Sequence, residues 1–532
     1  MIFWAVEMDM MVRRRTGAYY TCPTAAEKIT ERVLRRSGMK ILEPSFGSGV
    51  FLRSIRDVAE RLHGGNVRLV GAEISRIEYQ RALQCARVGD EFHFGDFMTM
   101  PVQQVDAVIG NPPYIRLRHL SPKASSVARS IASKLLGSEI AESASLWMPF
   151  VLRSLQFLGN GGSLSLVVPF EITHVKYAKS LWGVLCRSFS EVRLIRVGER
   201  IFPEILQDVV VLQCSGFGGS CKDIEFEIHD SLSGYLSDTG ADAHRISLDG
   251  IQSGSSPFSM ALLHGHPALK IADRVSSFKT KEICKFSVGY VAGDKEFFHP
   301  TEAVRRRFRL PRASLRPAVA SSRSIKCAGL LASGINSSLL TSLFLPNGDL
   351  SPGETRYVKH GELMGINEKY KCRVRRPWYV VPGVKVPDFL MGGFADIPIM
   401  LVNDVGLVSS NSLLGGNLSA GFNKGDFVAS WYTSLTLLDC EMKVHSLGGG
   451  VMILIPGEVD NICVPYVPNV DSAALEAIDS ALRSGDVDAA YRVGDEFVLR
   501  RKLGLRQRDV DEIRDAVNLM RSWRMRKRSH MA

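Results

Sequence analysis

The chain has 532 residues, a length typical of about two to four domains. Hydrophobic residues make up 45% and charged residues 23%, which excludes a largely disordered or fibrous chain. The formal net charge of +11 favours a polyanionic partner. No apolar stretch approaches the roughly 18 residues that a membrane span needs, so we expect no membrane partner.

Cysteines and the N-terminal residues indicate the compartment. The ten cysteines include no CxxC pair, so the sequence predicts neither a metal site nor a disulfide framework. The apolar N-terminus carries Glu7 and Asp9, and its basic run, Arg13 to Arg15, follows the apolar part. This order is the reverse of a secretory signal. We therefore expect a cytoplasmic protein.

Short apolar runs alternate with amphipathic stretches from residue 39 to about residue 214. Parallel strands need a crossover connection, so this alternation predicts a doubly wound, Rossmann-like α/β sheet. Its ligand is expected beyond the carboxyl ends of the strands. The predicted strands are 39–42, 67–72, 91–94, 105–109, 163–168, 192–197 and 209–213, and the predicted helices are 24–34, 51–62, 77–88, 146–158 and 178–189.

The composition changes to Gly, Ser and Asp between residues 216 and 267, where the regular alternation stops. We predict a first domain at 1–245 and a linker at 246–275. An irregular α/β domain follows at 276–470, and a helical, basic segment at 471–532 ends the chain.

A glycine loop follows the first predicted strand, at Glu43-Pro44-Ser45-Phe46-Gly47-Ser48-Gly49. Glycines let a backbone turn tightly and approach a ligand. Only two of the three glycines of a dinucleotide fingerprint are present, and Glu43 would repel a pyrophosphate but attract a cation. The loop therefore disfavours an NAD-dependent oxidoreductase and favours a cationic nucleoside such as S-adenosylmethionine.

Acidic residues also end the second and third predicted strands. Glu73, followed by Ile74, is placed to accept hydrogen bonds from two ribose hydroxyls. Asp96 is an acceptor suited to the exocyclic amine of an adenine, and Phe97 is an aromatic able to lie on its face. Three acidic residues at three successive strand ends match what a nucleoside needs.

The fourth predicted strand ends in Asn111-Pro112-Pro113-Tyr114. Two prolines make this loop rigid and exclude it from a central strand. The amide oxygen of Asn111 and a neighbouring backbone carbonyl can together accept both hydrogens of a planar amine. Such contacts raise the electron density on the nitrogen, which can then attack a methyl sulfonium. Tyr114 would stack on the base that bears the amine.

With these motifs, residues 16 to about 214 resemble the catalytic domain of N6-adenine-specific DNA methyltransferases. The subgroup is the TaqI/Eco57I-like one, with an N-terminal catalytic and a C-terminal target-recognition domain. Its Asn-Pro-Pro-Tyr motif matches at Asn111 to Tyr114, and its cofactor motif matches at Glu43 to Phe51. The motif around the cofactor's methionine end resembles residues 16–23, which contain Thr16, Tyr19, Tyr20, Thr21 and Pro23. An aromatic that forms the second wall of the flipped-base pocket matches Phe202.

The resemblance implies methyl transfer from S-adenosylmethionine to N6 of an adenine in duplex DNA, with Asn111 and the Pro112 carbonyl orienting the amine. It implies a bacterial or archaeal, nucleoid-associated modification enzyme without a metal, and it leaves room for a separately encoded restriction endonuclease. A fused nuclease is disfavoured, because no carboxylate-lysine cluster is evident. The residues expected to contact DNA are Arg305, Arg306, Arg307, Arg373, Arg375, Arg376 and Trp378.

Two other functions are compatible with the same motifs. A methyltransferase with the same loop could act on RNA or on a protein glutamine, although such enzymes usually lack a large C-terminal half. An inactive DNA-binding homologue is also conceivable, but the intact Asn111, Tyr114, Glu73 and Asp96 argue against it.

Overall fold

The computed structural model describes residues 22–199, 201, 208–253, 256–444, 446–447 and 450–525. The chain divides between Leu262 and Leu263 into two compact units, here unit 1 and unit 2, and unit 2 extends to Arg524. This division falls within the stretch 246–275 that composition marks as a linker. That stretch carries α9 (Leu248–Ser253), α10 (Pro257–Ala261) and α11 (Pro267–Ala272).

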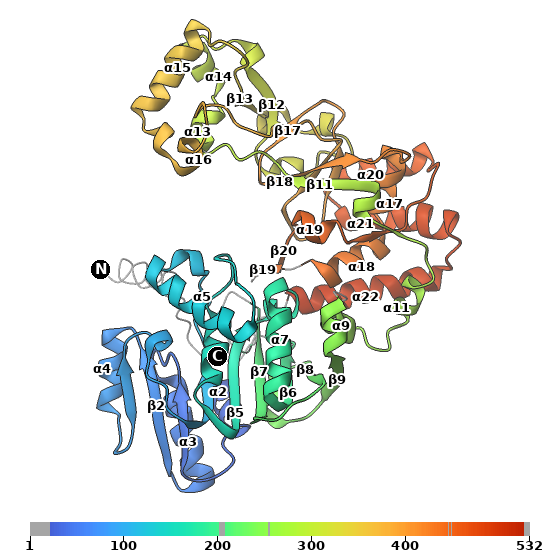
Figure 1. Cartoon of the computed structure of the whole chain (residues 1–532). Helices are drawn as coiled ribbons and strands as arrows, with labels where there is room; N and C mark the ends of the chain where they lie inside the picture. The colour runs from blue at the N-terminus through green and yellow to red at the C-terminus, as the bar shows by residue number, and fades with distance from the viewer. Residues whose placement is uncertain are drawn as a thin grey trace. The chain divides into compact units, whose positions relative to one another are not determined.

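Unit 1 is built on a nine-stranded sheet with the order β3-β2-β1-β4-β5-β7-β6-β8-β9 (Figure 1). The strands from β3 to β5 pair in parallel, whereas β7 is antiparallel to both of its neighbours. The mostly parallel sheet confirms the predicted α/β fold. The strands are β1 (Met39–Glu43), β2 (Val67–Glu73), β3 (Glu91–Phe94), β4 (Val105–Gly110), β5 (Leu158–Pro169), β6 (Phe189–Val197), β7 (Val209–Phe217), β8 (Asp223–His229) and β9 (Ala241–Ser247).

Helices form two layers in unit 1. The chain steps from β1 to β2 to β3 in one direction and from β4 to β5 in the other, so right-handed crossovers place the intervening helices on opposite faces. Accordingly, α2 packs on α3, and α5 packs on α6 and α7. The helices are α2 (Pro23–Glu31), α3 (Val50–His63), α4 (Arg76–Gln84), α5 (Pro122–Leu136), α6 (Trp147–Leu155), α7 (Lys176–Ser188) and α8 (Leu232–Ser237), with η1 (Phe97–Thr99), η2 (Leu117–His119) and η3 (Phe170–Thr173) as short 3-10 turns.

The apolar spacing of α3 shows how the sequence produces these elements. Phe51, Leu52, Ile55, Val58 and Ala59 recur every three or four residues and are all buried, so one face of the helix covers the sheet. The helix predicted over 146–158 is shorter in the structure, because the chain enters the sheet at its C-terminal end. There the carbonyl oxygen of residue 157 accepts a hydrogen bond of 2.8 Å from the N–H of residue 105.

The sheet continues beyond residue 214, where the sequence pattern predicts no further strand. β8 pairs in parallel with β6, and β9 pairs antiparallel with β8 at the sheet edge. β9 reads Ala-Asp-Ala-His-Arg-Ile-Ser and is largely exposed. An exposed edge strand lacks the apolar run that identifies a buried one, which explains why composition alone did not reveal it.

Unit 2 contains several small sheets instead of one large one. β11, β18, β14 and β16 form an antiparallel sheet in that order, and β12 lies between β13 and β17 in a second sheet. The strands are β10 (Phe278–Lys279), β11 (Cys284–Val288), β12 (Leu315–Val319), β13 (Thr341–Phe344), β14 (Phe389–Gly392), β15 (Phe394–Ala395), β16 (Met400–Val402), β17 (Val408–Ser409), β18 (Leu413–Leu418), β19 (Ser446–Leu447), β20 (Val451–Ile453) and β21 (Cys463–Val464).

The core of unit 2 includes a hydrophobic cluster around Phe297, Phe344 and Tyr357 and another around Ile325, Leu390 and Leu401. No helix in the described ranges is long and apolar enough to cross a membrane. The helices are α12 (Thr280–Ile283), α13 (Lys295–Phe298), α14 (Glu302–Phe308), α15 (Pro352–Leu363), α16 (Tyr370–Arg373), α17 (Lys424–Trp431), α18 (Ser434–Lys443), α19 (Pro456–Val459), α20 (Ser472–Arg483), α21 (Val487–Gly494) and α22 (Gln507–Met525), with turns η4 (Arg312–Ser314), η5 (Ser322–Ile325), η6 (Ala332–Gly334), η7 (Ser337–Leu339) and η8 (Ile366–Glu368) and the π-helix η9 (Asp495–Lys502).

Candidate active site and nucleic-acid interface

The candidate site lies where the strand order of unit 1 reverses direction. β1 lies between β2 and β4, and crossovers leave these strands in opposite directions, which makes the carboxyl ends of β1 and β4 a topological switch point. β1 ends at Glu43 and β4 ends at Gly110, so the glycine loop and the Asn111 loop emerge side by side.

Backbone geometry explains the glycines around this point. Gly49 has a φ of +74° at the start of α3, a conformation that residues with a Cβ rarely adopt. Gly71, in β2, lies beneath the loop, and a Cβ there would come within 2.7 Å of the Phe46 ring. The loop can therefore pack directly on β2.

Glu73 holds the glycine loop in place. Its side chain accepts hydrogen bonds from the N–H of Gly47 at 2.8 Å and from the N–H of Ser75 at 2.7 Å. The residue is 8% exposed, whereas the next side chain, Ile74, is 69% exposed. Each carboxylate oxygen has a further lone pair, so Glu73 retains acceptor capacity beside an open apolar side chain.

Glu43 is a buried acid with incomplete hydrogen bonding. Its side chain is 2% exposed, and Oε2 has no hydrogen-bond partner in the described part of the chain. Burial, followed by the nearby charge of Glu73, raises the pKa of Glu43 well above its usual range. A positively charged ligand beside this carboxyl would favour its ionised form. The unpartnered oxygen of Glu43 is therefore suited to a cation.

Asp96 and Phe97 have different environments from those predicted. One oxygen of Asp96 accepts from the N–H of Met98 at 2.9 Å and caps η1. Phe97 is 2% exposed and packs on Phe150 and Phe157, with ring centroids 5.2 and 5.3 Å away. The ring is thus a core residue in this structure and offers almost no free face to an adenine, which corrects the stacking role expected for it.

Tyr114 fixes the side chain of Asn111. The Tyr114 hydroxyl is 2.6 Å from Asn111 Oδ1 and 3.0 Å from the backbone oxygen of Val167 in β5. The hydroxyl of Ser45 donates to the backbone oxygen of Asn111 at 3.3 Å, which ties the glycine loop to the Asn111 loop. Tyr114 is only 8% exposed, so little of its ring is open for the predicted stacking on a base. The contacts that the structure does define are those of its hydroxyl.

A polar cluster that the sequence reasoning missed supports the segment after Tyr114. Glu171, just beyond β5, accepts from Trp147 Nε1 at 2.9 Å and from the Tyr177 hydroxyl at 2.8 Å. Arg116 donates to its other oxygen at 3.1 Å. The sequence feature that could have identified this cluster is the position of Glu171, another acidic residue just beyond a strand of the sheet.

Several predicted site residues lie outside the described ranges, namely Thr16, Tyr19, Tyr20, Thr21 and Phe202. Pro23 is described, and it is the first residue of α2, where a proline needs no N–H partner. Pro44 follows β1, and its ring would lie 3.2 Å from a Cβ at Gly110. Pro112 is buried and Pro113 is half-buried.

The arginines of α14 differ in their availability for phosphate contacts. Arg305 forms two hydrogen bonds of 2.7 Å with Glu302 and is 23% exposed. Arg306 shares the same carboxylate at 3.0 Å but is 76% exposed. Arg307 is exposed and lies over the Phe308 ring at 5.2 Å.

The second group of predicted DNA-binding residues also divides. Arg375 donates to the backbone oxygens of Val291 and Ala292, and Trp378 packs on Phe297 with its Nε1 bonded to Glu362 at 3.1 Å. These two side chains therefore hold unit 2 together. Arg373 and Arg376 are exposed. Across the described residues, no group of three or more His, Cys, Asp or Glu side chains is arranged to hold a metal ion.

Two family models match the chain. The model described as Eco57I restriction-modification methylase matches residues 72–202, which include Glu73, Asp96 and Asn111. The model described as Type II methyltransferase M.Eco57I, C-terminal domain, matches residues 266–499. The two matches follow the division between unit 1 and unit 2.

The chain is also similar to individual Type II methyltransferases. The Type II methyltransferase M.AccI of Acinetobacter calcoaceticus is 21% identical over 395 residues, which cover 69% of this chain and 69% of that protein. M.BstVI of Geobacillus stearothermophilus is 25% identical over 206 residues, or 32% and 36% of the two chains. The fold is similar to a nuclease-deletion mutant of the Type ISP restriction-modification enzyme LlaGI in complex with a DNA substrate mimic, at a TM-score of 0.50 and 11% identity over 88% of this chain and 47% of that chain.

Proposed function

Because the chain belongs to the Eco57I-type DNA methyltransferases of restriction-modification systems, with a C-terminal domain, we propose that it methylates N6 of an adenine at a specific site in double-stranded DNA. The observation that carries this proposal is the Asn111-Pro112-Pro113-Tyr114 loop at the carboxyl end of β4. This loop is anchored to the glycine loop through Ser45 and to β5 through Tyr114.

The proposed role of Asn111 is to accept one hydrogen of the target amine through Oδ1, while the Pro112 carbonyl accepts the other. An amide oxygen has two lone pairs, so the contact from Tyr114 leaves one for the amine. Accepting both hydrogens raises the electron density on the nitrogen as it attacks, an interaction stronger in the transition state than in the ground state.

S-adenosyl-L-methionine would supply the methyl group as an electrophilic sulfonium. The residues that fit this cofactor are the carboxyls of Glu43, Glu73 and Asp96, the glycine loop and the exposed side chain of Ile74. The unpartnered Oε2 of Glu43 is the observation that most directly favours a cationic ligand beside the glycine loop. Residues 16–21 remain proposed to bind its methionine end.

Duplex DNA is the proposed substrate, and the target adenine would have to leave the base stack to reach Asn111. The net charge of +11 and the exposed arginines of unit 2 support a polyanionic partner. We retain Phe202 as the proposed second wall of the base pocket, opposite Tyr114.

The test is to map N6-methyladenine in DNA from cells that express the chain, beside cells that express Asn111→Ala. We expect a methylated sequence motif with the wild-type chain and its loss with the variant, while the purified variant keeps its affinity for DNA because Asn111 acts mainly in the transition state. Asn66→Ala, an exposed asparagine in the same unit, serves as the matched control and should leave methylation unchanged.

Other outcomes would change the proposal in defined ways. Full methylation by Asn111→Ala would remove the proposed role of the loop. A folded wild-type chain that binds the cofactor but methylates no adenine would favour an RNA or a protein glutamine as substrate. A chain that binds DNA but not the cofactor would be an inactive homologue.

A further inference from the structure

Unit 2 exposes an unusual group of apolar side chains at the end of α15 and around α16. Leu363 is 87% exposed, Met364 65%, Tyr370 64% and Val374 62%. Single exposed apolar residues are ordinary on a protein surface. Four within twelve consecutive positions, each more than half exposed, are a concentration of apolar side chains typical of binding surfaces.

The same segment is strongly basic. Residues 363–376 contain five Lys and Arg residues against one acid, Glu368. Lys371 and Arg373 both lie over the Tyr370 ring, with their charged groups 5.5 Å from its centroid. Arg376 donates to the backbone oxygens of Arg373 and Arg375. These contacts are to a ring and to carbonyls, so they leave the three positive charges in place.

The segment is also held in a defined conformation. Lys369 pairs with Asp294, and Arg375 donates to the backbone oxygen of Ala292 at 2.8 Å. Cys372 is fully buried in the cluster around Phe297. The exposed apolar and basic side chains are therefore presented on a fixed support, which lowers the entropy lost on binding.

We propose that Leu363, Met364, Tyr370, Lys371, Arg373, Val374 and Arg376, here called the Tyr370 surface, bind duplex DNA. The cations would contact backbone phosphates, and the apolar side chains would lie against deoxyribose and base edges in a groove. This inference rests on the proposed function, and it identifies which face of unit 2 meets the substrate. A protein partner would have to place acidic side chains opposite Lys371, Arg373 and Arg376, whereas duplex DNA carries closely spaced phosphates along its whole length.

Replacing the cations and replacing the apolar residues should change DNA affinity in different ways. Each phosphate contact contributes a slope of about −0.9 to the dependence of log K on log salt concentration. The triple variant Lys371→Gln, Arg373→Gln, Arg376→Gln should therefore flatten the slope by about two to three. The pair Leu363→Gln, Met364→Gln should weaken binding by about tenfold at every salt concentration and leave the slope unchanged.

The experiment is fluorescence anisotropy of the full chain with a labelled duplex of mixed sequence, between about 50 and 200 mM salt. The matched control is Lys270→Gln, Lys281→Gln, Lys285→Gln, which removes the same charge from exposed positions on α11, α12 and β11. We expect the control to change the slope by less than about one. All the replaced side chains are exposed, and unchanged thermal melting would confirm that the variants fold.

Two results would overturn the inference. Equal slopes for the two triple variants, in a chain that still methylates DNA, would mean that the charges act only through the total charge and would leave the proposed function intact. Self-association of the wild-type chain that Leu363→Gln, Met364→Gln abolishes would identify a second copy as the occupant. A wild-type chain that neither binds nor methylates duplex DNA would instead remove the proposed function.

Discussion

At the scale of single residues, Asn111 depends on two neighbours for its position. Tyr114 contacts its side-chain oxygen, and Ser45 contacts its backbone oxygen. The Tyr114 hydroxyl has one proton for two acceptors, Asn111 Oδ1 and the backbone oxygen of Val167, so it couples the amide to β5. An amide freed from this contact would sample other rotamers and present its oxygen to the amine less often.

We therefore expect Tyr114→Phe to lower kcat by about 10- to 100-fold, because it keeps the ring but removes the hydroxyl that orients Asn111. The dissociation constants for S-adenosylmethionine and DNA should change little. The measurement is steady-state methylation with tritiated cofactor at varied DNA concentration, with Tyr79→Phe as control, since the Tyr79 hydroxyl bonds only weakly, at 3.4 Å, to a backbone oxygen. A variant with normal kcat but a raised KM would assign Tyr114 to binding of the base instead.

Strand-end position predicted which residues gather at the site, but not how each side chain is used. Glu43, Glu73, Asp96 and Asn111 could be identified because parallel strands end at one edge of a sheet. The use of Phe97 in the core could not be read from the sequence, since its packing partners Phe150 and Phe157 are more than fifty residues away. The backbone-oxygen partner of Arg375 and the carboxylate partner of Trp378 are visible only in the fold for the same reason, and the DNA contacts predicted for these two residues stay predictions.

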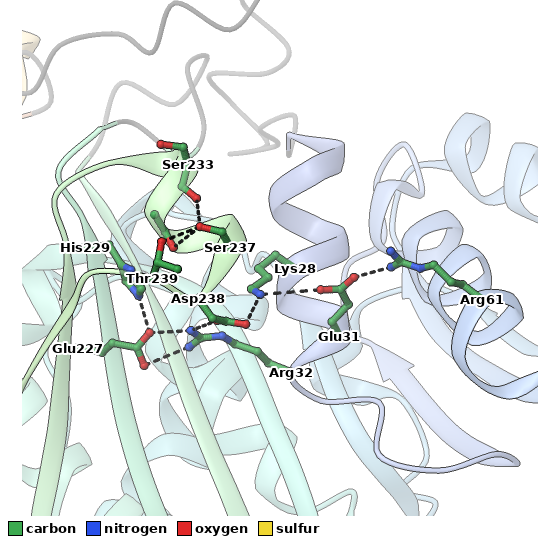
Figure 2. A network of polar contacts seen from close by, with 11 residues as sticks. Lys28, Glu31, Arg32, Arg61, Glu227, His229, Ser233, Ser237, Asp238 and Thr239 are labelled. Carbon is green, nitrogen blue, oxygen red and sulfur yellow. Dashed lines mark hydrogen bonds and ion pairs between the residues drawn. The ribbon is translucent and has the colours of Figure 1, made fainter.

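At the scale of elements, α2 is attached to β8 and α8 by a network of charged side chains (Figure 2). Arg32 donates to both oxygens of Glu227, at 3.1 and 2.7 Å, and to Asp238 at 2.7 Å. Lys28 also pairs with Asp238, and His229 Nε2 is 2.5 Å from Glu227. The network therefore fixes α2, which begins at Pro23, the last residue of the proposed methionine-end motif.

We predict that Arg32→Ala lowers the free energy of unfolding by about 3 kcal/mol, because it leaves the buried carboxylate of Glu227 without its main partner. The two side chains are 15% and 6% exposed. Arg36→Ala breaks an ion pair with Asp106 whose side chains are 64% and 33% exposed, so this control should cost less than about 1 kcal/mol. Urea unfolding at neutral pH compares the two, and equal losses would contradict the structural role of the network.

The same network predicts a dependence on pH. Burial raises the pKa of Glu227, but hydrogen bonds from Arg32 and His229 outweigh this effect and leave the pKa below its usual value of 4.5. A lowered pKa in the folded state contributes stability that is present above 4.5 and is lost as the pH falls through the folded value. Arg32→Ala should therefore lose less stability on acidification than the wild-type chain.

Helices and strands with a regular apolar pattern could be predicted from the sequence, whereas exposed edge strands and very short strands could not. β1, β2 and β4 have buried runs, and α3 has a clear helical spacing, so their positions followed from the sequence. β9 is an exposed edge strand, and the strands of unit 2 are as short as two residues, as in β15 and β17. Such elements are stabilised by pairing with distant segments, a contribution that local patterns do not contain.

At the scale of the whole molecule, the candidate cofactor residues and the Tyr370 surface belong to different units. Glu43, Glu73 and Asp96 lie before the division at Leu262, and Tyr370 lies after it. Each unit has its own sheets and its own buried core, as expected of separate domains. A ligand that contacts one unit should therefore stabilise that unit first.

Amide hydrogen exchange of the full chain tests this separation. We expect S-adenosylmethionine alone to slow exchange at residues 43–49 and 73–75, which include the Gly47 and Ser75 amides that donate to Glu73, and to leave residues 363–376 unchanged. Duplex DNA should slow exchange at 363–376. Glu73→Ala should abolish the effect of the cofactor while retaining that of DNA, because it removes the acceptor of the Gly47 and Ser75 amides but no residue of unit 2. Protection of 363–376 by the cofactor alone would mean that the units respond together, and the two binding functions would then have to be assigned to the chain as one body.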